Sequence, residues 1–267
     1  MAKIVWLASY PKSGNTWVRF LIANLIVGKA ADSGLLTRQI PDIGESISGH
    51  YLLGRKTTIV KTHWKFTTEL PLREDTIGVI YILRNPIDVL ESNQNYAFMR
   101  SGNLRREASP EQVATLAHKF AETYIAEGGH PQFRQFGVGS WEENVRSWTW
   151  PDIAFPRLIL RYEDIKTDTP GRLGQICRFL KLRRNDAEIE RAVSAASMEA
   201  MKAMEAREIA ARTEGFFFQR RNQSAIAAGH RFVGRSDDGR GLFRLTDDQR
   251  RRAQLRFEPL MRQFGYL

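Results

Sequence analysis

The chain has 267 residues, of which 42% are hydrophobic and 26% are charged, so it is long enough to bury a core and too apolar for a disordered chain. Its 40 Lys and Arg against 30 Asp and Glu give a formal net charge of +10, which favours an anionic partner such as nucleic acid, an acidic membrane or a phosphorylated or sulfated small molecule. The single cysteine, Cys177, excludes an intrachain disulfide, and its apolar neighbours place it in the core. No signal peptide and no apolar stretch of the length of a membrane span is recognisable, so we expect a cytoplasmic protein.

Strand-like and helix-like segments alternate along the chain. Four short aliphatic or β-branched runs are typical of buried parallel strands: Lys3–Ala8, Thr57–Lys61, Ile77–Leu83 and Pro156–Arg161. Helical patterns follow three of them: Thr16–Val27, Pro86–Met99 and Thr169–Leu180. This alternation predicts one α/β domain over residues 1–267, with a central parallel sheet and helices on both faces. The loops after the strands should then meet at one edge of the sheet.

Two segments interrupt this alternation. Residues 100–139 are long and charged, and they contain an expected helix from Pro110 to about Ala126. Residues 214–241 are polar and rich in glycine. Segments of this kind are either binding-site lids or plain surface insertions, and the sequence does not decide between them.

The segment Tyr10–Trp17 lies between the first expected strand and the first expected helix, and it indicates an anion site. A tight loop in this position directs backbone N–H groups and a helix N-terminus at one point. Lys12 adds a positive charge there, and the neighbouring hydroxyl and amide side chains add neutral donors. The order of residues differs from the Walker A motif, because Lys12 precedes the only glycine, Gly14.

Two further clusters follow strands and should reach the same edge of the sheet. Arg84 ends the third strand, Pro86 occupies the first position of a helix, and Ser92 lies about two turns into it. A guanidinium fixed at a strand end can hold a phosphate through two parallel hydrogen bonds. The other cluster, Lys61-Thr62-His63, follows the second strand.

These three segments resemble the cytosolic-type sulfotransferases, which use 3′-phosphoadenosine 5′-phosphosulfate (PAPS) as sulfuryl donor. The resemblance implies a P-loop-like α/β fold and transfer of the sulfuryl group to a hydroxyl of a small molecule, which gives 3′-phosphoadenosine 5′-phosphate (PAP) and a sulfate ester. It implies that His63 is the general base and that Lys12 and Lys61 stabilise the transferring group. It also implies the donor-site residues: Lys12, Ser13, Gly14, Asn15 and Thr16 around the 5′-phosphosulfate, Trp17 against the adenine, and Arg84 and Ser92 on the 3′-phosphate.

Weaker matches cover the rest of the chain. A Tyr-Glu-Asp segment places Tyr162 beside the nucleotide, and Met198 stands where the family has an adenine-stacking phenylalanine. Near the end of the chain, Arg235 takes the place of the family's 3′-phosphate lysine, although the Gly-Asp-Trp that follows in the family is missing. A Gly-Ser-Trp segment containing Trp141 should lead a helix near the acceptor, although structural roles for Trp141 and Tyr162 fit the sequence at least as well as ligand contact. The acceptor pocket should be built from Trp64, Phe66, Trp141, the segment around Tyr96–Arg106 and the loop around Phe216–Arg221.

The resemblance implies neither a metal nor a nucleic-acid partner. No histidine or cysteine pair has the spacing of a structural metal site. A homodimer is compatible with the sequence, but the family's dimerisation motif is not recognisable. Two rival functions remain: a P-loop kinase or NTPase, and a polyanion-binding protein suggested by the net charge and by the runs Arg220-Arg221 and Arg250-Arg251-Arg252.

Overall fold

A four-stranded parallel sheet forms the centre of the molecule, in a computed structural model that describes residues 3–28, 30, 32–44, 57–100, 109–150, 154–219, 222–227, 231–233 and 244–267. The strand order is β2-β1-β3-β4. The strands are β1 (Lys3–Ser9), β2 (Thr57–Thr62), β3 (Thr76–Leu83) and β4 (Arg157–Arg161). All four predicted strands are confirmed, each within one residue at its ends.

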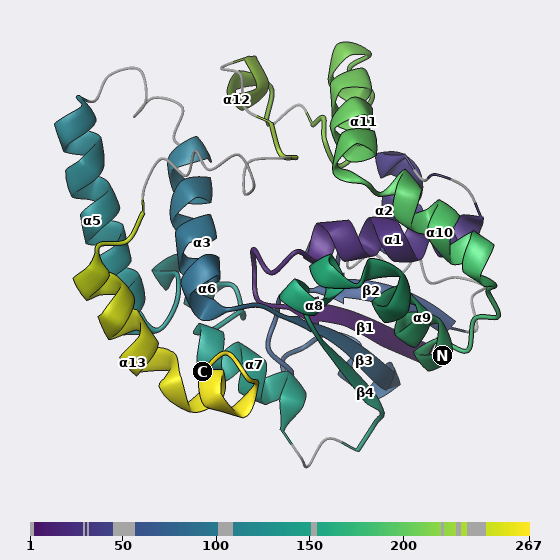
Figure 1. Cartoon of the computed structure of the whole chain (residues 1–267), viewed down its shortest axis with the longest axis horizontal. Helices are drawn as coiled ribbons and strands as arrows, with labels where there is room; N and C mark the ends of the chain where they lie inside the picture. Colours follow the sequence, from purple (N-terminus) through teal and green to yellow (C-terminus); the bar gives the residue numbers. More distant parts are fainter. Residues whose placement is uncertain are drawn as a thin grey trace.

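The helices lie on both faces of the sheet, as predicted (Figure 1). On one face lie α1 (Asn15–Val27), α9 (Thr169–Phe179) and α10 (Asp186–Ala195). On the other lie α3 (Pro86–Arg100), α5 (Pro110–Glu127), α7 (Trp141–Thr149) and α13 (Asp247–Gln263). The remaining helical segments are α2 (Ser33–Gln39), the 3-10 turn η2 (Arg73–Asp75), α6 (Pro131–Gln135), α8 (Tyr162–Thr167), α11 (Met198–Ala210) and α12 (Gln223–Ala227). The four predicted helices are confirmed within one residue at each end.

Side chains of the central strand alternate between two cores. Ile4, Trp6 and Ala8 of β1 pack with α3, α5, α7 and α13, whereas Val5 and Leu7 pack with α1, α9 and α10. Every one of these five residues is buried, which explains why the strand reads as a continuous apolar run and not as an alternating pattern.

The strand order fixes the place where a ligand can approach. From β1 the chain crosses to β2 on one side and then to β3 on the other side. Neighbouring loops leave the sheet in opposite directions at such a switch point, and a crevice forms outside the carboxyl ends of the strands. The loops after β1 and β3 flank this crevice. They are the segments that contain Lys12 and Arg84.

The two interrupting segments are only partly described. In residues 100–139 the described part forms α5 and α6, and in residues 214–241 it includes α12 and residues 231–233. Arg235 lies outside the described residues.

Candidate active site

The loop between β1 and α1 has a backbone suited to an anion. Lys12 has a φ of 71° and Gly14 a φ of 87°, so two residues of this short loop lie in the left-handed region. Gly14 occupies the N-cap of α1 and offers no side-chain cap, so the first N–H groups of the helix stay available at that position. The Ser13 hydroxyl is buried and has no hydrogen-bond partner among the described residues. A buried unpaired hydroxyl in a loop of this geometry fits a polar ligand.

The ring of Tyr162, at the start of α8, lies directly against this loop. A Cβ on Gly14 would stand 2.4 Å from Tyr162 Cδ2, so no other residue fits there without moving the ring. The indole of Trp17 meets the same ring edge-on, with centroids 6.0 Å apart, and donates from Nε1 to the carbonyl of Ala196 at 2.9 Å. Ala196 precedes α11, whose first residue is Met198. Trp17, Tyr162 and the start of α11 are therefore brought together, as the sequence predicts.

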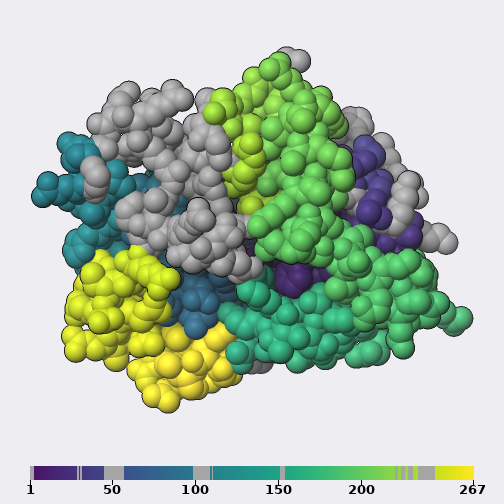
Figure 2. Space-filling model, turned by 45° about the horizontal axis from the view of Figure 1, so that its top comes forward, coloured from purple at the N-terminus to yellow at the C-terminus, as the bar shows by residue number. Residues whose placement is uncertain are grey.

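Figure 2 shows N-terminal atoms at the bottom of a hollow between the green helices and the teal segment. This view agrees with the contacts that Gly14 and Trp17 make with Tyr162 and Ala196.

Arg84 connects the end of β3 to the loop after β1. Its Nη1 donates to the carbonyl of Lys12 at 2.9 Å, and its guanidinium lies 4.7 Å from the centre of the Tyr162 ring. Its Nε is buried and unpaired among the described residues, so the group keeps a donor for a ligand. Ser92 lies half-buried on α3, and its predicted contact with the same ligand stays a prediction.

Within the described part of the chain, the ammonium group of Lys12 lies near aromatic rings and forms no ion pair with a carboxylate. Its Nζ is 4.2 Å from the centre of the Tyr96 ring and 5.5 Å from that of Phe232. Burial, together with the positive charge of Arg84, lowers the pKa of Lys12 to about 8. Neither Tyr96 nor Phe232 was expected to contact Lys12, because no sequence pattern pairs residues so far apart.

His63 is held by the end of β1, next to the loop. Its Nδ1 lies 2.8 Å from the carbonyl oxygen of Ser9, which can only accept, so Nδ1 carries the proton and Nε2 keeps a lone pair. Asn144 of α7 donates to the backbone carbonyl of His63 at 2.8 Å. Burial and then the charge of Lys61 lower the pKa of His63 well below its usual value, whereas Asp42 acts in the opposite sense. The imidazole is therefore neutral at pH 7, with a basic nitrogen available.

Lys61 is already engaged by a carboxylate. Its Nζ lies 2.6 Å from Asp42 Oδ2, and the two side chains are only 12% and 14% exposed. Asp42 lies in the segment that bridges to β2 at Lys61, and the sequence reasoning missed it because the pairing is purely tertiary. The predicted contact of Lys61 with a sulfuryl oxygen would compete with this ion pair.

Two expected acceptor-pocket residues pack on the core, Trp141 fully buried and Phe66 partly buried. Trp141, the first residue of α7 after the Ser140 cap, is fully buried and packs edge-on against Phe257 of α13. Phe66 packs on Trp148 and Phe155 at centroid distances of 5.0 and 5.1 Å. Trp64 lies against Gly137, in the segment that follows α6, and stays a candidate.

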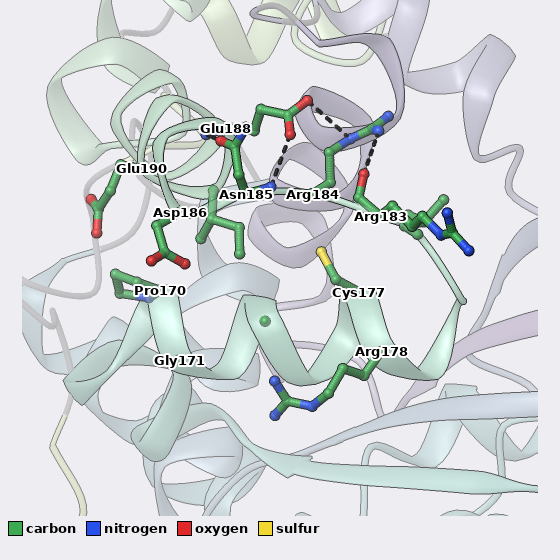
Figure 3. A pocket seen from close by; sticks show the side chains of 13 residues that line it. Pro170, Gly171, Cys177, Arg178, Arg183, Arg184, Asn185, Asp186, Glu188 and Glu190 are labelled. Atoms are coloured by element: carbon green, nitrogen blue, oxygen red, sulfur yellow. Dashed lines mark hydrogen bonds and ion pairs between the residues drawn. The ribbon is translucent and has the colours of Figure 1, made fainter.

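A hollow of about 770 Å³ lies elsewhere, between α9 and α10 (Figure 3). Gly171, Gly174 and Cys177 line its α9 side, and charged residues of both signs line the other. Burial raises the pKa of the Cys177 thiol, which agrees with its expected place in the core. None of the predicted site residues lines this hollow.

The arginine run of α13 is paired with acidic residues. Arg250 bonds Glu91 of α3 at 2.6 Å, Arg251 bonds Asp248, and Arg252 bonds both Asp248 and Glu122 of α5. The run thus fastens α13 to the neighbouring helices, which weakens the polyanion-binding rival. Within the described ranges, no cluster of three or more His, Cys, Asp or Glu could hold a metal, and no helix is long and apolar enough to cross a membrane.

Comparisons with known proteins bear on the family and the fold. Residues 3–265 match the family model described as "Sulfotransferase domain". The chain is 29% identical to "Sulfotransferase 2A6" of Rattus norvegicus over 73% of its own length and 66% of that protein. It is 28% identical to the "3-alpha-hydroxysteroid sulfotransferase" of Cavia porcellus, over 86% and 78% of the two chains. The aligned region thus spans about two thirds of the first of these relatives.

Two solved structures share the fold. One is mouse sulfotransferase SULT7A1 complexed with PAP, with a TM-score of 0.63, 21% identity and coverage of 97% of this chain and 85% of that one. The other is retinol dehydratase in complex with androsterone and inactive cofactor PAP, with a TM-score of 0.60, 17% identity and coverage of 97% and 80%. Both support the expected P-loop-like α/β fold.

Proposed function

Because the chain belongs to the sulfotransferase domain family, we propose that it transfers the sulfuryl group of PAPS to a hydroxyl group of a small molecule. The products would be PAP and a sulfate ester. The relatives are named as sulfotransferases, and two structures that share the fold are described with PAP. A cytoplasmic location follows from the same family and is proposed with it, whereas a homodimer stays a prediction.

One observation carries the proposal: the three sequence motifs meet at one edge of the sheet through direct contacts. Arg84 donates to the carbonyl of Lys12, and His63 donates to the carbonyl of Ser9, three residues earlier. The guanidinium of Arg84 and the neutral imidazole of His63 thus both bind one short stretch of backbone, the end of β1 and the anion loop that follows it. This is the set of groups that in-line transfer from a phosphosulfate to an alcohol requires.

The residues present fit a PAPS molecule. Gly14 and the start of α1 can receive the 5′-phosphosulfate, with the unpaired hydroxyl of Ser13 and the side chain of Thr16 beside it. The Asn15 amide instead donates to the Leu7 carbonyl and the Ser9 hydroxyl, each at 3.2 Å, so we propose that Asn15 fixes the loop on β1. Arg84, with its unpaired Nε, can bind the 3′-phosphate, and the planes of Trp17 and Tyr162 can hold the adenine. We propose the same nucleotide roles for Ser92, Met198 and Arg235. Bound PAPS supplies the activated sulfuryl group.

The catalytic role that we propose for His63 follows from its tautomer. With Nδ1 bound to the Ser9 carbonyl, Nε2 can accept the proton of the acceptor hydroxyl as that oxygen becomes a nucleophile. The resulting imidazolium keeps its Nδ1 hydrogen bond, which fixes the ring during the proton transfer. The low pKa of His63 ensures that the base is unprotonated before the reaction.

The two lysines would act by charge. Lys12 is the cation of the loop itself, so we assign it to the transferring group and the leaving oxygen, where negative charge increases. Lys61 would assist from β2 by turning its ammonium from Asp42 to the transferring group, in competition with their ion pair. No metal is part of this proposal, because lysine and backbone donors can stabilise a sulfuryl group, which carries less charge than a phosphoryl group.

A turnover assay with a variant of His63 tests the proposal. PAP formation would be measured with PAPS and a panel containing a phenol, a steroid alcohol and a monosaccharide. His63→Ala should lower kcat by roughly 10²-fold or more, while PAP binding largely survives. His118→Ala is the matched control, because the side chain of His118 on α5 is 61% exposed and its contacts are with Glu122 and Gln249, neither of which is a proposed site residue. Turnover of His63→Ala within a few-fold of the unchanged protein would show that the base is assigned wrongly.

A further inference from the structure

The segment that follows α13 is fastened to the strand ends that form the proposed donor site. Arg161, the last residue of β4, donates from Nη1 to the carbonyl of Gly265 at 2.8 Å, and its guanidinium lies 4.5 Å from the centre of the Tyr266 ring. The Tyr266 hydroxyl donates to Glu163 Oε2 at 2.9 Å. These contacts join residues about a hundred positions apart in the sequence.

Glu163 is a bridge between this segment and the start of α3. While Oε2 accepts from Tyr266, Oε1 accepts from the backbone N–H of Asn85 at 2.9 Å. The Asn85 side chain in turn accepts from the N–H of Ile87 and so caps α3. Asn85 is therefore held on two sides, and both of its bonds are made just where β3 becomes α3.

Asn85 follows Arg84 directly, so the bridge acts on the backbone that carries the proposed phosphate clamp. The guanidinium of Arg84 is itself placed by only two described contacts, with the Lys12 carbonyl and with the Tyr162 ring. A bidentate clamp loses much of its strength when its fork is misplaced, because both hydrogen bonds depend on one plane. Small shifts of the Asn85 backbone would therefore reach the ligand through Arg84.

The chemistry of the bridge makes Tyr266 the donor and Glu163 the acceptor of their hydrogen bond. Burial, and after it the negative charge of Glu163, raise the pKa of Tyr266, so the phenol keeps its proton and acts as the donor. A carboxylate is an acceptor only, so Glu163 can join two donors, and each of its oxygens has one here. The other charged groups that face this junction are Arg161, which covers the Tyr266 ring, and Asp164, whose carboxylate lies 3.8 Å from Arg161 Nε.

We propose that Tyr266 and Glu163 are positioning residues for recognition of the 3′-phosphate, acting through the Asn85 backbone on Arg84. This inference rests on the proposed function of the site as a PAPS site. It predicts a larger effect on the 3′-phosphate than on the rest of the nucleotide. The bridge holds the backbone next to Arg84 itself, whereas the 5′-phosphate loop and the Tyr162 ring meet only the Arg84 side chain. A merely structural role would weaken every nucleotide equally.

The test compares PAP with adenosine 5′-phosphate, which lacks the 3′-phosphate, by titration calorimetry on the full chain. Tyr266→Phe removes only the hydroxyl and leaves the ring under Arg161. It should raise the Kd of PAP about fivefold, which corresponds to about 1 kcal/mol, and leave the Kd of adenosine 5′-phosphate within about twofold. Glu163→Gln should have a larger effect of about tenfold on PAP, because an amide can place a donor against the Asn85 N–H. Leu267→Ala is the control on the same segment, since Leu267 is 53% exposed and should change neither affinity.

The outcomes separate this inference from the function on which it rests. If the unchanged protein does not prefer PAP over adenosine 5′-phosphate, the proposed donor site itself fails. If it does, but the variants keep that preference or weaken both ligands by the same factor, only the positioning role is refuted. A thermal melt of each variant accompanies the titrations, and equal loss of both affinities together with a lowered Tm counts against the proposal.

Discussion

Replacing Gly14 by alanine is the most informative single change at the site, because the structure predicts two separate costs. The first is conformational: at a φ of 87° an L-residue is strained, by about 1–2 kcal/mol. The second is steric, since the new Cβ would lie 2.4 and 2.5 Å from two carbons of the Tyr162 ring. Carbon atoms pack at about 3.5 Å or more, so the ring must move by about 1 Å.

Gly28 provides a matched control at the other end of the same helix. It has a φ of 72°, and no atom of the described residues lies within 4 Å of a Cβ built there. Gly28→Ala should therefore show the conformational cost alone, about 1–2 kcal/mol in the free energy of unfolding, and no change in nucleotide affinity. Gly14→Ala should show that cost and also displace the ring against which Arg84 and Trp17 lie.

The assay is chemical denaturation together with titration of PAP. We expect Gly14→Ala to raise the Kd of PAP about 10- to 100-fold, which corresponds to about 1.4–2.8 kcal/mol. The substitution Tyr162→Ala should cost less affinity for PAP in the Gly14→Ala background than in the unchanged protein, because it also removes the clash between the new Cβ at position 14 and the Tyr162 ring. The reasoning is refuted if Gly14→Ala binds PAP as tightly as Gly28→Ala does.

Two further predictions concern charge. Because the pKa of Lys12 is lowered to about 8, kcat/KM for PAPS should fall as the pH rises through about 8, where the ammonium loses its proton. Lys12→Arg should move this fall to higher pH. A flat profile from pH 7 to 9 in the unchanged protein would contradict the role of Lys12 as the cation of the loop. Replacing the run Arg250-Arg251-Arg252 by alanines should not change the affinity for duplex DNA, which should be weak in both proteins at every salt concentration. The substitution should lower the free energy of unfolding by less than about 1 kcal/mol per surface ion pair. A steep salt dependence of DNA binding that the alanine variant loses would instead revive the polyanion-binding function.

The parts of the fold that the sequence predicted are those set by local pattern. The β1 strand reads as an apolar run because Ile4 and Val5 point into different cores, and both cores are closed by helices. The loop around Gly14 was recognised because its residue types, and not its distant partners, determine the backbone. His63 and Arg84 were placed correctly at the edge of the sheet because each follows a strand by at most one residue.

What the sequence did not predict depends on tertiary pairing. Asp42 takes the ammonium of Lys61, and no spacing rule connects these two residues. Trp141 was expected at the acceptor pocket, yet it is buried against Phe257 of α13, a helix whose position against the sheet the sequence pattern does not indicate. Tyr266 reaches Glu163 across about a hundred residues of chain. Contacts of this kind follow from how the helices pack on the sheet, which the local pattern leaves open.

The central claim is that the crevice at the end of β1 and β3 binds a nucleotide through its 3′-phosphate. Calorimetric titration of the unchanged protein with PAP, beside adenosine 5′-phosphate and ATP with Mg²⁺, tests it most directly. The account predicts micromolar binding of PAP that is lost or greatly weakened without the 3′-phosphate. Absence of PAP binding, or a preference for ATP with Mg²⁺, would contradict it and favour a P-loop kinase or NTPase.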